Sequence, residues 1–388
     1  MRQSSLVMVL PFRTNYFCDY AKVFEETGLL RLILLGTRRP VAGVPREKQI
    51  LQPAFGLWFY LAARIFSPYR GEALRFGTYP LFDFWASRKL RAGDSVFSSF
   101  GYANRCFRMA RKHGGINLLD AGNSHPENFW KLVSEEHRRW GCHYPPISPA
   151  HYRRSVAMMK EVDWVLAPSR FVENSFLGHG FSAQQIFRNP YATDLSVFRP
   201  GSPRPPDRPF TVINTGGLSL RKGTPYLLEA LRVLWDNIPN LRILLTRQVS
   251  DSIQPILARY GDLPIEWSET LPPASLAERL RTADLFILPS IEEGMARTAL
   301  EAMACGLPVI LTSNTGACDL VQEGVNGSIV PIRDAAAIVE RALFWCDRIL
   351  GGAGQREIGQ AHLSQLALPA FGRRLEEFIK RIAVAPSS

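Results

Sequence analysis

One stretch of the sequence, from Ala283 to Leu311, constrains the fold more than any other. The apolar run at residues 283–288 predicts a buried strand, and residues 309–311 predict the next one. Between them, small and straight-chain residues from Ala296 to Cys305 predict a short helix, which the following glycine and proline end. A strand, a helix and a strand in this order predict a parallel α/β unit.

The same order of elements is predicted in both halves of the chain. Strands at residues 6–10 and 29–35 flank one helix, and strands at residues 210–214 and 241–246 flank another. The 388 residues are enough for two such domains. A proline-rich linker at residues 201–207 separates them. We therefore predict two doubly wound, Rossmann-like parallel-sheet domains, residues 1–200 and residues 201–369.

Two carboxylates lie in the loop and helix of the first stretch, Glu293 and Glu301. In a doubly wound sheet, ligands bind where a strand ends and the next helix begins. The N-terminus of that helix offers free N–H groups to an anion, here near Gly294, Met295, Ala296 and Thr298. The alternative is an acidic first helical turn with a solvated Glu301, but the glycines and flanking strands favour a binding site.

A second candidate loop follows the first strand of the second half. Gly216 and Gly217 allow the backbone to approach a ligand closely, and Arg221 and Lys222 supply positive charge for a diphosphate. The alternative is a basic turn on the surface.

These motifs together resemble the retaining glycosyltransferases of family 4, which have the GT-B fold. Glu293 and Glu301 have the spacing of the family's E-x7-E signature, and Lys222 matches the lysine of its phosphate loop. The arginine of that loop falls on Gly217, so that Arg221 is the substitute. The resemblance implies a UDP-, GDP- or ADP-sugar donor in the second domain and a glycan, lipid-linked or small-molecule acceptor in the first. It also implies polysaccharide or glycolipid synthesis, and a C-terminal helix at residues 370–388 that packs on the first domain.

The resemblance also assigns roles to single residues. It places Glu301 at the ribose and Glu293 at the transferred sugar, with backbone N–H groups of Gly294 and Met295 beside it. His125, which follows a strand predicted at residues 116–120, matches the family's histidine facing the sugar; the alternative is a loop histidine satisfied by backbone. Retention of configuration is implied, and neither a cofactor nor a catalytic metal is expected; the sequence has no D-x-D motif.

The formal charge of +11 predicts an anionic partner. Residues 51–112 hold ten Lys or Arg against three Asp or Glu, together with many aromatic residues. This composition suits an anionic membrane surface, and equally an aromatic core under a solvated basic face. No nucleic-acid-binding motif accompanies it, so we expect no nucleic-acid partner.

Six cysteines without a C-x-x-C pair predict reduced thiols, and no apolar run reaches the length of a membrane span. We therefore expect a cytoplasmic protein, peripheral at the inner membrane face if residues 51–112 bind lipid. A loose cluster of His137, Cys142, His143 and His151 fits no standard zinc site. The rival functions are a nucleotide-sugar epimerase or phosphorylase on the same fold, and a non-catalytic basic protein that binds membrane or nucleic acid.

Overall fold

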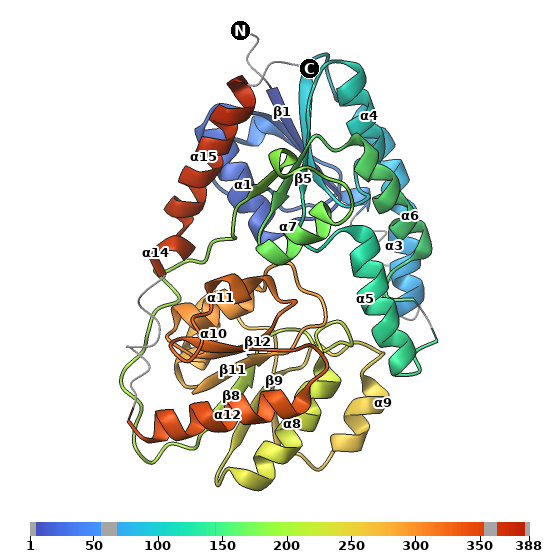
Figure 1. The fold of residues 1–388 in the computed structure, drawn as a ribbon. Helices are drawn as coiled ribbons and strands as arrows, with labels where there is room; N and C mark the ends of the chain where they lie inside the picture. Colours follow the sequence, from blue (N-terminus) through green and yellow to red (C-terminus); the bar gives the residue numbers. More distant parts are fainter. Residues whose placement is uncertain (1–4, 56–67, 144, 353–362, 385–388) are drawn as a thin grey trace.

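The computed structural model describes residues 5–55, 68–143, 145–352 and 363–384. Two α/β domains lie one above the other in Figure 1, the N-terminal domain at the top. Each is built on one parallel sheet, which confirms the predicted fold class. Part of the basic stretch at residues 51–112, residues 56–67, lies outside the described residues.

The first sheet has the strand order β3-β2-β1-β4-β5-β6-β7. Its strands are β1 (Ser5–Leu10), β2 (Leu30–Leu35), β3 (Gln49–Leu51), β4 (Asp94–Ser99), β5 (Asn117–Asp120), β6 (Trp164–Ala167) and β7 (Ile186–Arg188). The helices of this half are α1 (Asn15–Glu26), α3 (Pro68–Ser87), α4 (Asn104–Lys112), α5 (Pro126–Arg139), α6 (Pro149–Met158) and α7 (Arg170–Leu177).

The second sheet has the order β10-β9-β8-β11-β12-β13. Its strands are β8 (Thr211–Asn214), β9 (Arg242–Thr246), β10 (Ile265–Ser268), β11 (Leu285–Leu288), β12 (Val309–Thr312) and β13 (Gly327–Val330). The helices are α8 (Thr224–Asn237), α9 (Gln254–Leu257), α10 (Pro273–Arg281), α11 (Arg297–Ala304) and α12 (Ala335–Leu350). The linker predicted at residues 201–207 lies between β7 and β8.

The strand orders identify where each sheet reverses its direction of winding. The reversal falls between β1 and β4 in the first sheet and between β8 and β11 in the second. Central strands such as β11 and β12 are fully buried and, except for Thr312 at the end of β12, apolar, as expected of parallel strands covered on both faces. Ligands of doubly wound sheets bind at these reversals, so that the loops after β1, β4, β8 and β11 are the places to examine.

The last described helix packs on the first domain. After α12, the described residues continue with α14 (Leu363–Leu366) and α15 (Leu368–Val384). Helix α15 lies beside α1 in Figure 1, where the Phe371 ring meets the Tyr20 ring edge-on at 5.0 Å. It begins at Leu368, two residues before the predicted start of the C-terminal helix.

The apolar side chains of α3 divide between core and surface. Phe82 is fully buried, whereas Leu81 is 63% and Phe84 47% exposed. The guanidinium groups of Arg88 and Arg105 lie over the Phe84 ring. No helix among the described residues combines the length and apolar character needed to cross a bilayer.

Candidate active site

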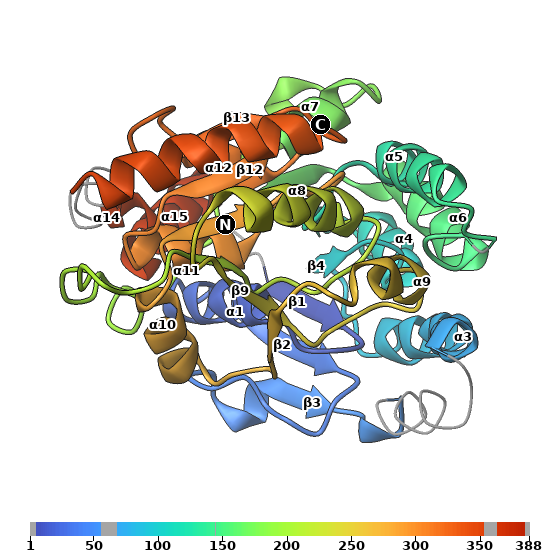
Figure 2. The same ribbon diagram turned by 90° about the horizontal axis from the view of Figure 1, so that it is seen from below.

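The loop after β8 packs against the loop after β11. Gly223 has a positive φ of 66°, and a Cβ there would lie 1.8 Å from the carbonyl oxygen of Pro289. Only glycine fits this conformation and this contact without strain. Gly216 is fixed because its N–H donates to Oδ1 of Asn214 at 2.8 Å. The basic loop is therefore held against the start of the Glu293 segment. Helix α8, which follows this loop, lies beside α12 (Figure 2).

Lys222 and Arg221 both reach Glu293. The Nζ of Lys222 pairs with Oε2 of Glu293, and Nη1 of Arg221 lies 3.2 Å from the same oxygen. Nη1 of Arg221 also donates to the carbonyl of Glu292 at 2.9 Å. Burial raises the pKa of Glu293, but the charges of Lys222 and Arg221 outweigh it and bring this pKa below its usual value. The cluster is therefore an ionised, largely buried network.

Helix α11 begins directly after this cluster. Met295 and Ala296 are buried. The helix begins at Arg297, one residue later than predicted, and Ala296 directly precedes it. The Thr298 hydroxyl lies 4.0 Å from a Cβ position built at Gly216, so the helix meets the first loop here. Glu301 lies further along the helix and lines a cavity of ≈ 580 Å³ that both domains enclose.

Charged groups of both domains surround the cavity at Glu301. Arg13, Asp19 and Lys22 of the first domain line it together with Arg297. Nη1 of Arg297 lies 3.4 Å from Oδ2 of Asp19 and so connects the domains. Burial raises the pKa of Glu301 to about 7, against a smaller opposing effect of Arg297.

The first domain contacts residues 292–294 closely. A Cβ at Gly294 would lie 2.1 Å from the carbonyl oxygen of Gly122, so glycine is required for the domains to approach so closely. The Ser169 hydroxyl donates to the Gly294 carbonyl at 2.7 Å. The Ser124 N–H donates to Oε1 of Glu292 at 2.9 Å. The Glu293 cluster therefore lies directly opposite the strand-end loop of β5.

A cavity of ≈ 190 Å³ opens in the first domain at its own sheet reversal. Its walls are largely aromatic, and its polar lining includes Asp120 at the end of β5. Oδ1 of Asp120 accepts a hydrogen bond from the Tyr191 hydroxyl at 3.0 Å. Burial raises the pKa of Asp120 to about 7, although this hydrogen bond opposes the shift. The aromatic lining residues are Phe12, Tyr16, Phe100, Tyr102, Phe129 and His151.

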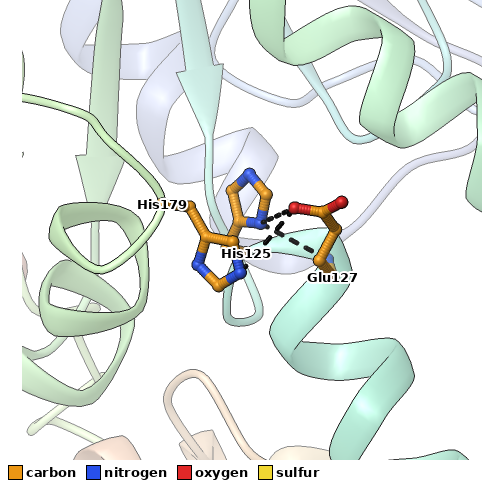
Figure 3. A group of neighbouring side chains, drawn as sticks. All are labelled: His125, Glu127 and His179. Carbon is orange, nitrogen blue, oxygen red and sulfur yellow. Dashed lines mark hydrogen bonds and ion pairs between the residues drawn. The ribbon is translucent and has the colours of Figure 1, made fainter.

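His125 does not have the position expected of a residue that faces the sugar. Its imidazole is 4% exposed, stacks on His179 with ring centroids 4.0 Å apart and meets Phe176 edge-on. It lines neither of the two cavities described above, although Ser124 and Pro126 line the first. Figure 3 shows its ring beside His179 and Glu127. Its role toward the sugar stays a prediction that this orientation does not support.

The structure thus brings Gly216, Arg221, Lys222, Glu293, Gly294 and Thr298 together. Gly217 lies nearby, where a Cβ would be 3.6 Å from Gln248. Sequence reasoning missed Glu292, a fully buried carboxylate that receives the Ser124 N–H, and Asp120. Asp120 carried a detectable signal, since it is an acid at the end of a buried parallel strand. Glu292 had no such signal in the sequence, because its orientation depends on a contact with the other domain.

Residues 199–347 match the family described as Glycosyl transferases group 1. Most of the second domain of this chain therefore matches a group 1 glycosyltransferase domain. The putative glycosyltransferase EpsD of Bacillus subtilis is 26% identical over 247 residues, which are 60% of this chain and 61% of EpsD. A D-inositol 3-phosphate glycosyltransferase of Segniliparus rotundus is 31% identical over 45% of this chain and 42% of its own. The aligned regions therefore span between about two fifths and three fifths of these relatives.

Solved structures extend the similarity in fold to the whole chain. Sucrose-phosphate synthase from Thermosynechococcus elongatus superposes with a TM-score of 0.70 and 18% identity, covering 98% of this chain and 100% of its own. Anabaena HepE, determined with UDP and glucose, superposes with a TM-score of 0.68 and 15% identity, covering 97% of this chain and 100% of its own. The group 1 glycosyltransferase domain therefore sits in a two-domain GT-B fold.

Proposed function

We propose that this protein transfers a sugar from a nucleotide diphosphate sugar to a hydroxyl group of an acceptor, in polysaccharide or glycolipid synthesis. The observation that carries the proposal is the cluster of Lys222, Arg221 and Glu293 at the start of α11, opposite the loop after β5. Negative charge develops on the departing nucleoside diphosphate, and buried cations stabilise it strongly. The EpsD relative, a putative glycosyltransferase, supports the reaction class, and the HepE complex supports a UDP-sugar as the first donor to test.

Within this reaction the donor residues take distinct parts. Lys222 and Arg221 neutralise the diphosphate, and the free N–H groups near Ala296 add the positive end of α11. Glu293 binds hydroxyl groups of the transferred sugar. Glu301, about one turn into α11, binds the ribose.

We place the acceptor in the aromatic cavity of the first domain, because sugar rings pack well on aromatic faces. Asp120 accepts a hydrogen bond from the attacking hydroxyl. We further propose transfer with retention of configuration and without a catalytic metal, as the resemblance to family 4 implies. The two cations then fulfil the electrostatic role that a divalent ion has in other transferases.

We also propose that the surface around α3 touches an anionic membrane. Leu81 and Phe84 are exposed apolar residues, and Arg88 and Arg105 lie beside them. Apolar side chains that insert at the interface and basic groups that bind anionic headgroups are the two components of such a contact. The protein should float with anionic liposomes at low salt, and Phe84→Asp should reduce flotation. Equal flotation of both proteins would assign these residues to another surface role.

The function is tested with a panel of UDP-, GDP- and ADP-sugars, by thermal shift and by release of nucleoside diphosphate with and without oligosaccharide acceptors. Lys222→Ala should lower turnover roughly 100-fold or more, because it removes a buried charge at the leaving group. Lys160→Ala, which changes a lysine next to β6, is the matched control. Near-normal turnover of Lys222→Ala would exclude the phosphate role. Isomerised donor or free sugar without acceptor would instead indicate the rival epimerase or phosphorylase.

A further inference from the structure

Three metal-ligating side chains meet on the first domain, outside both cavities described above. His125 precedes α5, Glu127 lies in its first turn and His179 follows α7. Their ligand atoms all lie within 4.8 Å of one another. Oε2 of Glu127 is 3.9 Å from Nδ1 of His125 and 3.8 Å from Nε2 of His179. Figure 3 shows the carboxylate turned toward both rings.

The hydrogen bonds of the two imidazoles indicate which ring nitrogens can act as ligands. Nδ1 of His179 lies 2.7 Å from the Ser175 carbonyl, which can only accept, so Nδ1 carries a proton and Nε2 is the nitrogen that can ligate in the neutral ring. Nδ1 of His125 accepts the Glu127 N–H at 3.3 Å, so this nitrogen is unprotonated, and a metal ion bound to it would replace this long hydrogen bond.

Ser175 supports both rings. Its hydroxyl oxygen accepts the His125 backbone N–H at 2.9 Å, while its carbonyl fixes the tautomer of His179. Such outer contacts are typical around metal-ligating histidines, because they orient the ring and keep one nitrogen unprotonated. His125 is buried, whereas the side chains of Glu127 and His179 are 49% and 28% exposed, so solvent and ions can reach the group.

We propose that His125, Glu127 and His179 bind a divalent transition-metal ion such as Zn²⁺, with water completing the coordination. Two imidazoles and one carboxylate are a ligand set that Zn²⁺ and its first-row neighbours prefer over Mg²⁺ or Ca²⁺. The rings are nearly parallel, so the exposed His179 ring must tilt for both lone pairs to meet one ion. This site is independent of the proposed transfer reaction.

The ion would anchor a segment that borders the interface between the domains. Ser124, next to His125, donates its N–H to Glu292 of the second domain. Metal bound at His125 therefore restrains the loop that contacts the Glu293 cluster. The role of the ion is structural or regulatory, because none of the three side chains lines either of the two cavities described above.

The test is calorimetric titration of the metal-stripped full-length protein with ZnCl₂, with circular dichroism of each variant as a folding control. We expect about one equivalent of Zn²⁺, and at least tenfold weaker binding for His179→Ala and for Glu127→Gln. His113→Ala, which removes an exposed histidine at the end of α4, should bind as the wild type does.

Cobalt(II) spectra distinguish this site from the cysteines. The Co²⁺ complex should show ligand-field bands without thiolate-to-metal charge transfer, and His179→Ala should weaken the bands. No binding at millimolar Zn²⁺, undiminished binding by folded His179→Ala, or a strong thiolate band would each overturn the proposal.

Discussion

The raised pKa of Glu301 gives a prediction whose size follows from the structure. Burial raises this pKa from 4.5 to about 7. A carboxyl with a raised pKa holds its proton more tightly in the folded than in the unfolded protein. Ionising it therefore costs no stability below about pH 4.5; the cost grows between pH 4.5 and 7 and is complete above pH 7. At about 1.4 kcal/mol per pKa unit, the full cost is about 3 kcal/mol.

Glu301→Gln removes this cost and keeps the shape of the side chain. At pH 8.5 the variant should be more stable than the wild type, by up to about 3 kcal/mol of unfolding free energy. For a chain of this length, that corresponds to a melting temperature about 4 °C higher. At pH 4.5 the two proteins should differ little, because Glu301 is then protonated in the folded state and only about half ionised in the unfolded state.

Differential scanning fluorimetry across pH 4.5–8.5 measures the difference, and Glu340→Gln is the matched control at an exposed helical position. A difference in melting temperature that does not change with pH would refute the reasoning, as would a variant that is less stable at pH 8.5. Either result would mean that Glu301 is ionised at little cost in the folded protein.

Three further predictions concern catalysis. Glu301→Ala should mainly raise the donor KM and Glu293→Ala should mainly lower kcat, because ribose contacts contribute uniform binding; the reverse split would exchange the two roles. Gly294→Ala should lower kcat roughly tenfold or more by holding the domains apart, while Gly261→Ala in an open turn should not; equal rates would show that closure tolerates a methyl group. Asp120→Asn should slow transfer to acceptor more than hydrolysis of the donor, and an equal loss of both would remove Asp120 from the acceptor.

Local sequence patterns were sufficient for the fold and for part of the site. Apolar runs predicted β11 and β12, and the glycine and proline after α11 predicted its end, because these features depend on neighbours in the chain. The same holds for Lys222, Glu293 and Gly294, whose loops follow strands on either side of one sheet reversal. Their meeting follows from the strand order, which the alternation of strands and helices already implies.

Contacts between distant segments were not predictable in this way. The His125 ring turns toward His179 and Phe176 of the α7 region, and nothing near His125 in the sequence specifies that orientation. Glu292 receives a hydrogen bond from Ser124, 168 residues away in the other domain. The way the two domains approach each other decides which of the two adjacent glutamates contacts the other domain. The sequence therefore predicted a role for Glu293 alone.

The charge balance of the cluster explains why the two motif carboxylates should differ in function. Two cations, Arg221 and Lys222, face two carboxylates, Glu292 and Glu293, within a largely buried space. Arg221 and the Ser124 N–H hold Glu292, so this carboxylate is committed to the domain interface. A diphosphate brought beside Lys222 competes with Glu293 for its ammonium group. Under the proposed function that exchange turns the Glu293 carboxylate toward the sugar hydroxyls as the donor binds, whereas Glu301, in a separate cavity, takes no part in it.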